Sequence, residues 1–434
     1  MTKRKMKDSG VEWIGEIPED WEVTKNKYIF EQKKQIVGSD WENYQLLSLT
    51  TGGIIEKDIN NLQGKLPESF GTYQVVEKDD LILCLFDLDM SAVFNSKSLF
   101  DGMISPAYRR YKLKVEGSIN YYNYLFDYIF VDRKYTSYST TLRFTLDNDE
   151  FGDIPTIVPS KSEQIKIAKF LDEKINIVNY NIIKITDEIL KLKEYKKSII
   201  TETVIKGLDR DVPMKDSGIE WIGEIPEHWL SSRIQYESWV RARLGWKGLK
   251  SEEYTDNGYP LLSAFNIKND KLDWHSEVKF INKTRFDESP EIKLNIGDVL
   301  LLKDGAGIGK CARIDNLPLG ESTTNSSLAV ITPNKSLDYK YLYYYLLSGI
   351  FKNFTNRVLN GMGVPHLTQE EIKKIKIPVP PIKEQKKISD YLDLRTSDID
   401  AILLKKQTQI QNLEEYKKCL IYEYVTGKKE VDRG

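Results

Sequence analysis

The sequence has few cysteines and no long apolar run. Three of its 434 residues are cysteine, and no two of them form a CxxC pair. We therefore expect no disulfide framework and no cysteine-rich zinc site, and a reducing cytoplasm suits the chain. No window reaches the roughly 18 uninterrupted apolar residues of a membrane-spanning helix. The basic start MTKRKMKDSG leads into no apolar segment, so we expect neither a secretory signal nor a membrane partner.

A large excess of charge of either sign is also missing. The formal net charge is −2, and 40% hydrophobic with 29% charged residues is the composition of an ordinary folded protein. Residues 22–153 contain 15 Lys and Arg against 20 Asp and Glu, whereas residues 230–374 contain 20 against 17. The overall charge gives no support for nucleic-acid binding. Any basic surface must be local or supplied by a partner.

One stretch of the sequence occurs twice. KDSGVEWIGEIPEDW, from Lys7 to Trp21, returns as KDSGIEWIGEIPEHW from Lys215 to Trp229. The two copies lie nearly half a chain apart, far more than the roughly 20 to 50 residues that separate solenoid repeats. The sequence therefore predicts an internal duplication. We expect Trp13 and Trp221 to anchor the start of each copy on the rest of the fold.

Each copy of the motif is followed by a mixed α/β region and then by a long helix. In the first half, QLLSL, DDLILCLF and AYRRYKLKV have strand character, and residues 120–130 are expected to be a helix. IPTIVPSKSEQ then leads into residues 161–205, which contain no Gly or Pro. KIPVPPIKEQ repeats this transition in the second half. The expected regions are 1–153 (the first globular region), 154–214 (the first long-helix region), 215–374 (the second globular region) and 375–434 (the second long-helix region).

Apolar residues recur every three or four positions along both long helices, which is the pattern of a coiled-coil seam. Antiparallel pairing of the two helices would place the two globular regions at opposite ends of a rigid rod. The predicted fold is therefore mixed α/β (α+β), with two globular domains joined by an antiparallel coiled coil in a pseudo-two-fold repeat. The expected seam residues are Leu171, Ile175, Val178, Ile182, Ile185, Ile189, Leu192, Tyr195 and Ile199, then Leu392, Thr396, Ile399, Leu403, Lys406, Ile410, Leu413, Tyr416 and Leu420, with Thr396 and Lys406 as polar exceptions.

This arrangement resembles the specificity subunit of type I restriction–modification systems. The resemblance rests on the paired WIGEIPE motifs, on the strand and turn that run into EQ at Gln164 and Gln385, and on the long helices that carry EYKK. It covers essentially the whole chain. It implies that the globular regions are target recognition domains, each reading one half of a bipartite DNA sequence. The coiled coil would then fix the gap between the half-sites.

The same resemblance implies partners and cofactors. The family's subunit has no catalytic site and no cofactor of its own. It binds double-stranded DNA and docks two modification (methyltransferase) subunits that methylate adenine with S-adenosylmethionine. In the larger complex it also docks two restriction (translocase and nuclease) subunits, which require ATP and Mg²⁺. Methylation of a base within a duplex requires base flipping by the partner enzyme.

Catalytic motifs are either incomplete or missing. KDGAGIGKCARI, residues 303–314, departs from GxGxxG because Lys310 replaces the third glycine, and from the Walker pattern because Cys311 replaces Ser or Thr. We expect a tight turn between two strands there. The only Pro-Pro is followed by Ile382, not by the aromatic residue of an adenine methyltransferase loop. Glu291-Ile292-Lys293 matches a nuclease fragment at a level expected by chance, and three scattered histidines suggest no metal site.

Several basic and polar residues could contact DNA phosphates or base edges. They lie on an expected strand, in the loops that precede the two long-helix regions, and in the glycine-rich turn. For any single residue, a solvated surface role is as plausible as a DNA contact. The candidates are Tyr108, Arg109, Arg110, Thr140, Thr141, Arg143, Arg241, Arg243, Lys247, Lys310, Asn325, Asn360 and His366.

Two other functions stay open at this point. A scaffold that binds only proteins is favoured by the negative charge of the first globular region. An enzyme that cleaves or methylates DNA by itself is disfavoured by the missing motifs. The target bases and the spacer cannot be deduced from the sequence.

Overall fold

The computed structural model describes residues 4–59, 69–131, 133–243, 249, 251–305, 307–359 and 366–431. The chain forms two compact units. Unit 1 contains residues 1–185 and 408–434, and unit 2 contains residues 186–407. Each unit takes its globular region together with parts of both long helices. The four regions expected from the sequence are consecutive segments of the chain. The compact units instead combine segments that are far apart in the sequence.

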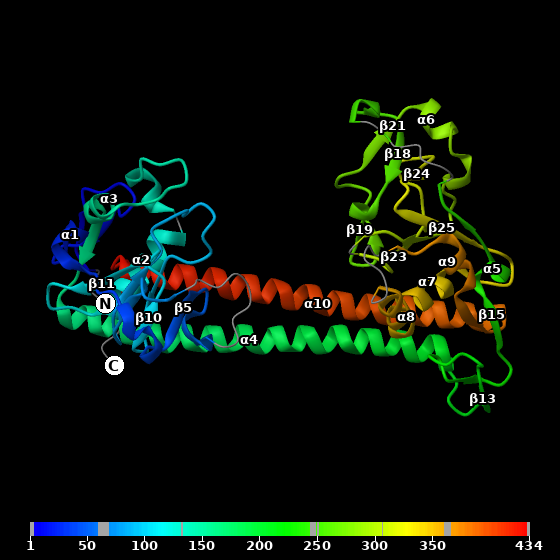
Figure 1. Cartoon of the computed structure of the whole chain (residues 1–434), viewed down its shortest axis with the longest axis horizontal. Helices are drawn as coiled ribbons and strands as arrows, with labels where there is room; N and C mark the ends of the chain where they lie inside the picture. Colours follow the sequence, from blue (N-terminus) through cyan, green and yellow to red (C-terminus); the bar gives the residue numbers. More distant parts are fainter. Residues whose placement is uncertain are drawn as a thin grey trace. The chain divides into compact units, whose positions relative to one another are not determined.

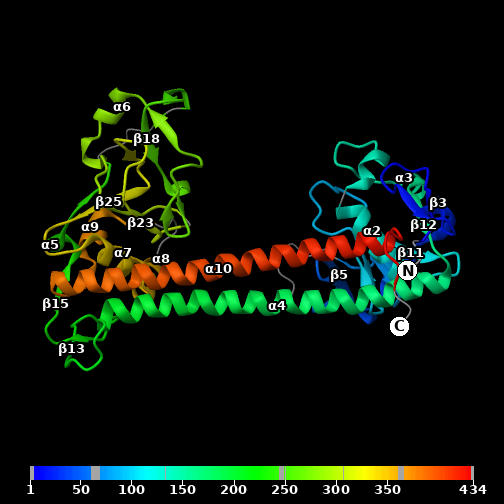
Figure 2. The ribbon, with the colours of Figure 1, turned by 180° about the vertical axis from the view of Figure 1, so that it is seen from behind.

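Two long helices pass through both units and lie side by side within each of them (Figures 1 and 2). In unit 1 the first part of one helix meets the last part of the other, and Lys417 Nζ donates to Asn179 Oδ1 at 3.2 Å. In unit 2 the order is reversed, and Lys196 Nζ donates to Asp400 Oδ1 at 2.6 Å. The pairing is antiparallel in each unit, which confirms the predicted coiled coil. The helices are α4 (Lys161–Lys206) and α10 (Ile382–Val425).

Two of the predicted seam residues were wrong. Tyr195 and Tyr416 are 55% and 51% exposed. Lys196 and Lys417, the next residues in each EYKK motif, reach the opposite helix instead. A coiled-coil seam alternates steps of three and four residues, and a step of four from Leu192 arrives at Lys196. The aromatic residue next to it is thereby turned outward.

The polar exceptions in the second seam are both satisfied. Thr396 Oγ1 donates to the Leu392 carbonyl one turn earlier, at 2.7 Å. Lys406 Nζ donates to Glu188 Oε2 on the facing helix. Polar seam residues with partners favour one helix register over others.

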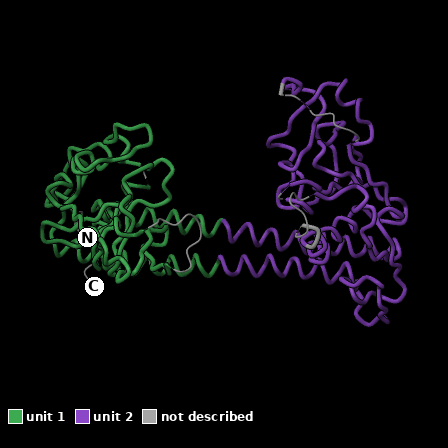
Figure 3. The backbone as a smooth tube through the Cα atoms, viewed as in Figure 1, with its two compact units in different colours: residues 1–185, 408–434 green, residues 186–407 purple. Residues whose placement is uncertain are grey.

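Unit 1 contains two four-stranded sheets (Figure 3, green). One is antiparallel, with the order β4-β11-β8-β9, and the other has the order β6-β5-β10-β7 with β5 and β10 parallel. The helix predicted at residues 120–130 is confirmed as α2. The elements are β1 Met6–Asp8, β2 Glu16–Pro18, β3 Glu22–Lys25, α1 Asn26–Ile29, β4 Phe30–Lys33, β5 Leu46–Thr50, β6 Gly53–Lys57, β7 Gln74–Val76, β8 Leu81–Leu83, β9 Asn95–Lys97, β10 Gly102–Ile104, β11 Arg109–Leu113, α2 Ile119–Val131, α3 Asn148–Asp153 and β12 Pro155–Val158.

Unit 2 repeats this plan with shorter and more numerous strands (Figure 3, purple). Its sheets have the orders β16-β25-β22-β23 and β17-β21-β18-β24, and β18 and β24 are again parallel. The elements are β13 Met214–Asp216, β14 Glu224–Pro226, β15 Leu230–Arg233, α5 Ile234–Glu237, β16 Ser238–Arg241, β17 Tyr254–Thr255, β18 Tyr259–Leu262, β19 Ile267–Lys268, β20 Lys271–Leu272, β21 Lys279–Ile281, α6 Lys283–Asp287, β22 Val299–Leu302, β23 Cys311–Arg313, β24 Thr323–Thr324, β25 Leu328–Pro333, α7 Tyr339–Leu347, α8 Gly349–Leu359, α9 Gln369–Lys374 and β26 Lys376–Val379.

A set of buried contacts, which we call the first seat, holds the first globular region on the two long helices. The indole of Trp21 is fully buried, and its Nε1 donates to Glu163 Oε2 at 2.8 Å. The Gln164 side chain accepts from a backbone N–H just before α2. From α2, the Tyr121 hydroxyl donates to the Val425 carbonyl at the end of α10, at 2.9 Å. The globular region is thus attached to the start of one long helix and the end of the other.

The second seat repeats these contacts in unit 2. The buried indole of Trp229 donates to Glu384 Oε1 at 3.1 Å. The Gln385 side chain accepts from the backbone N–H that begins α7, at 2.7 Å. The Tyr341 hydroxyl donates to the Val204 carbonyl at the end of α4, at 2.9 Å. The repeated motif and the EQ pairs are therefore the two sides of one attachment.

A glycine with positive φ ends each long helix at its seat. Gly207 has φ +74° and Gly427 has φ +69°. A Cβ at Gly427 would lie 2.5 Å from Pro18 and 3.0 Å from the ring of Trp21. Glycine is required there both by the left-handed backbone and by the close approach of the repeated motif.

We predict that Gly427→Ala destabilises the protein more than Gly10→Ala. Gly10 also has a positive φ, +72°, but no atom lies within 4 Å of its hypothetical Cβ. The Gly10 variant should lose about 1 kcal/mol from backbone strain alone. The Gly427 variant should lose more, because strain and overlap add. Thermal unfolding of the two full-length variants measures the difference, and equal losses would contradict the packing role of Gly427.

Candidate nucleic-acid interface

Each antiparallel sheet contains a buried ion pair. Arg110 on β11 donates to Asp80 just before β8, and their side chains are 3% and 0% exposed. Burial raises the pKa of the Asp80 carboxyl, and the neighbouring Arg110 acts in the opposite direction. In unit 2, Arg241 on β16 donates to Asp298 Oδ2 at 2.7 Å, and this pair is equally buried. The structure gives no support to the expected DNA contacts of Arg110 and Arg241, because buried carboxylates hold both guanidinium groups.

The two buried pairs take their arginine from different strands. In the first sheet Arg110 lies on β11, opposite Lys33 of the edge strand β4. In the second sheet Arg241 lies on the edge strand β16, opposite Val330 of β25. The arginine of the second sheet thus occupies the position that Lys33 occupies in the first. The buried aspartate has the same place in both sheets, directly before β8 or β22. Each sheet supplies its buried carboxylate with a cation, but from a different point in the sequence.

Three segments converge at one edge of the second globular region. The turn after β22 is closed by Leu302 N donating to the Lys310 carbonyl at 2.8 Å, which confirms the predicted turn between two strands. Lys303 N donates to the Ser327 carbonyl in the segment before β25, at 2.9 Å. Leu367 N, before α9, donates to the Lys303 carbonyl at 2.8 Å. We call this set of segments the second junction.

The equivalent segments converge in the first globular region and form the first junction. Leu146 N, before α3, donates to the Leu85 carbonyl after β8, at 2.7 Å. The ring of Tyr108, before β11, lies 6.1 Å from the ring of Phe86 in the segment after β8. The same three positions of the fold thus meet in both regions.

The first junction carries most of the candidates from the first half of the sequence. Thr140 and Thr141 are exposed and held by internal hydrogen bonds: the Thr140 hydroxyl donates to Glu150 Oε1 at 2.8 Å. Arg143 is exposed, whereas Tyr108 and Arg109 are half-buried. These residues come from two segments, and the structure brings them to one edge.

The second junction carries three candidates from the second half. Lys310 and His366 are exposed, and His366 Nδ1 pairs with Asp304. Asn325 is half-buried, and its Oδ1 accepts from Ser327 N at 3.1 Å. The predicted contacts at Lys247 and Asn360 lie outside the described residues.

Arg243 lies two residues after Arg241, just past the end of β16. It is half-buried, and burial together with the nearby Arg285 lowers its pKa. Its Nε is buried without a hydrogen-bond partner among the described residues. Arg243 stays a candidate for contact with an anion.

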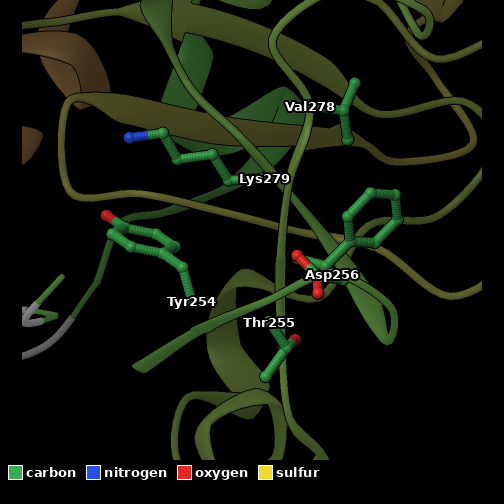
Figure 4. A pocket seen from close by; sticks show the side chains of 6 residues that line it. Tyr254, Thr255, Asp256, Val278 and Lys279 are labelled. Atoms are coloured by element: carbon green, nitrogen blue, oxygen red, sulfur yellow. The ribbon is translucent and has the colours of Figure 1, made fainter. Parts of the chain in front are cut away.

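A cavity of about 370 Å³ lies between β17 and β21, and its lining contains no residue of the second junction. Figure 4 shows Lys279 beside Tyr254, and Lys279 Nζ lies 4.6 Å from the centre of that ring. Asp256 and Thr255 complete the polar part of its lining. Lys279 is already paired with the Tyr254 ring, and Asp256 is acidic. This lining is therefore not suited to bind phosphate.

Among the described residues, no cluster of His, Cys, Asp or Glu could hold a metal ion. In the same part of the chain, no helix is long and apolar enough to cross a membrane.

Known proteins share both the sequence pattern and the fold. Residues 245–415 match the model of the type I restriction modification DNA specificity domain. The chain is 26% identical over 425 residues to the type I restriction enzyme MjaVIII specificity subunit of Methanocaldococcus jannaschii, covering 95% of this chain and 93% of that protein. It is 24% identical over 210 residues to the EcoKI specificity subunit of Escherichia coli, covering 48% and 44%.

A solved structure described as the basis of complex assembly and conformational transition of the type I R-M system has the same fold. One of its chains matches with a TM-score of 0.70 at 15% identity, over 95% of this chain and 99% of that chain. The chain is therefore similar to type I restriction–modification specificity subunits over most of its length.

The sequence alone did not identify the residues that attach the globular regions to the long helices. Trp13 and Trp221 were expected as anchors, but both are half-buried and pack beside Tyr128 and Phe354. The fully buried indoles belong to the last residue of each motif, Trp21 and Trp229. The available signal was the EQ pair, whose glutamate is the partner of that indole.

The buried pair of unit 1 gives a stability prediction. Arg110→Met removes the closest cation of the buried Asp80 and leaves Lys112 Nζ at 3.8 Å, so the free energy of unfolding should fall by about 3 kcal/mol. The neighbouring Arg109 is half-buried and outside this pair, so Arg109→Met should change stability by about 0.5 kcal/mol or less. Chemical unfolding of both variants is the measurement. Similar losses in the two variants would show that the buried ion pair contributes no more to stability than the half-buried Arg109 does.

Proposed function

We propose that this chain is a type I specificity subunit that reads a bipartite, asymmetric DNA site, with one half-site for each globular region. The observation that supports this most strongly is the repeated seat, because two unlike globular regions are held by equivalent contacts on the same pair of helices. Their junctions carry different side chains in equivalent places. Two readers that differ in their contacts recognise different half-sites, and their joint occupancy multiplies specificity.

The outer faces of the helices support a docking role. In unit 1, α4 exposes Ile177, Tyr180 and Ile183 on successive turns, and in unit 2, α10 exposes Leu394 and Leu404. Exposed apolar side chains on otherwise polar helices are suited to a helical partner. We assign these faces to two adenine-methylating modification subunits and, in the larger complex, to two restriction subunits. S-adenosylmethionine, ATP and Mg²⁺ are then cofactors of those partners, and the complex works on the chromosome in the cytoplasm.

An exchange of one globular region tests the modular part of the proposal. Residues 22–153 are replaced with the corresponding segment of another specificity subunit, and the host's methylated motifs are mapped by methylome sequencing. One half of a bipartite adenine motif should change while the other half and the spacer stay. The matched exchange of residues 230–374 should change the other half. A first exchange that leaves both halves unchanged, or alters both, contradicts one reader per half-site.

Two measurements separate this proposal from its alternatives. A protein-only scaffold predicts that DNA binding by the assembled complex lacks a steep dependence on salt, whereas a DNA reader that neutralises phosphates predicts a steep one. An enzyme in its own right predicts that the isolated chain methylates DNA with S-adenosylmethionine or cleaves it with Mg²⁺. We expect activity only with the partner subunits present, and loss of the motif from a host that lacks this gene.

A further inference from the structure

An exposed carboxylate is paired with a basic side chain at the first junction. Arg143 Nη1 lies 3.5 Å from Asp87 Oδ2, and the Arg143 side chain is 74% exposed. Asp87 belongs to the segment after β8, and Arg143 to the segment before α3. A further hydrogen bond, from Asp87 N to Thr145 Oγ1 at 3.1 Å, holds the two segments together. Asp87 has φ +47°, a left-handed conformation that a non-glycine residue keeps only when its surroundings enforce it.

The second junction carries a pair of the same kind. His366 Nδ1 pairs with Asp304 Oδ1, and both side chains are partly exposed. Asp304 also accepts from Lys303 Nζ at 2.7 Å, which holds the carboxylate in place. Asp304 comes from the segment after β22 and His366 from the segment before α9. These are the same two segments of the fold as in the first junction.

Stability does not account for the two pairs. An exposed ion pair contributes about 0 to 1 kcal/mol to stability. The pairs are also not copies of one ancestral pair, because their members occupy different places within the equivalent segments. Leu85 and Lys303 are equivalent, since each accepts from the leucine before α3 or α9. Asp87 lies two residues after that point and Asp304 one residue after it. The feature that recurs is a carboxylate side chain that orients a basic side chain at this edge.

We propose that Arg143 and His366 each read one base edge in their half-site, and that Asp87 and Asp304 are the positioning residues that orient them. This inference rests on the proposed DNA-reading function. An arginine oriented by a carboxylate presents its fork to the O6 and N7 atoms of guanine. An ionised carboxylate only accepts hydrogen bonds, so Asp304 accepts one from Nδ1–H of His366, and Nε2 is left as the ring nitrogen available to a DNA base.

The test uses the full chain with its modification subunits and a library of DNA sites. The motif of the wild-type complex is determined first, and base preference at every position is then compared among variants. Arg143→Lys keeps the positive charge but loses the fork, and Asp87→Asn keeps the size but loses the carboxylate. Both should relax the preference for one guanine, in one half-site only, by about 5- to 100-fold. Asp87→Glu should restore part of it.

The second pair is tested in the same way with His366→Ala and Asp304→Asn, which should relax one base pair in the other half-site. Matched controls are Glu116→Gln and Glu370→Gln, which remove exposed ion pairs outside the junctions and should leave every base preference unchanged. Thermal unfolding confirms that all variants fold.

The outcomes separate this inference from the proposed function. If the junction variants weaken methylation equally at all sites, with base preferences unchanged, these residues contact phosphate or serve the fold, and the inference is overturned. If relaxation appears in both half-sites for a single variant, the assignment of one reader to each pair is overturned. A wild-type complex that yields no bipartite motif contradicts the proposed function itself.

Discussion

The attachment of each globular region depends on one buried indole that donates to a glutamate at the start of a long helix. Trp21 and Trp229 are fully buried, and a buried N–H without an acceptor is costly. The glutamate of each EQ pair supplies that acceptor, while the adjacent glutamine accepts from a backbone N–H at the start of α2 or α7. The motif occurs in both halves of the chain because each copy forms one half of such an attachment. The other half is the start of α4 or α10.

The two seats differ where the two motif copies differ. In the first, Asp20 pairs with Arg4, and Arg4 also reaches Glu163 at 2.6 Å. In the second, the corresponding residue is His228, which hydrogen-bonds directly to Glu384 at 2.9 Å. A cationic or hydrogen-bonding group thus accompanies the glutamate in both seats, but it comes from outside the motif in one and from inside it in the other.

Much of this fold could be predicted from the sequence, because its long helices and repeated motif are local patterns. The antiparallel coiled coil, the helix at residues 120–130 and the turn after β22 all follow from periodicity and turn residues. Tyr195 was misplaced because hydrophobicity favoured it for the seam over Lys196, whereas the buried position is decided by helical phase. The lysine reaches Asp400 on the facing helix, and that contact cannot be read from one helix alone.

The candidate site was harder to predict, because exposure depends on long-range pairing. Arg110 and Arg143 are equally basic in the sequence, yet a buried carboxylate draws the first into the core and a surface carboxylate leaves the second in solvent. Loops that precede the long-helix regions were identified as candidates, but their meeting with the segments after β8 and β22 was not. The structure adds the two junctions, and with them Asp87 and Asp304 as the partners of the basic side chains Arg143 and His366.

The central claim is that each globular region is held by its own seat. Hydrogen–deuterium exchange of the full chain carrying Trp21→Phe, compared with Trp229→Phe, tests it most directly. Trp21→Phe should speed exchange in residues 22–153 and at the end of α10, and leave residues 230–374 unchanged. Trp229→Phe should show the reverse pattern. Equal acceleration in both globular regions for either variant would contradict the account.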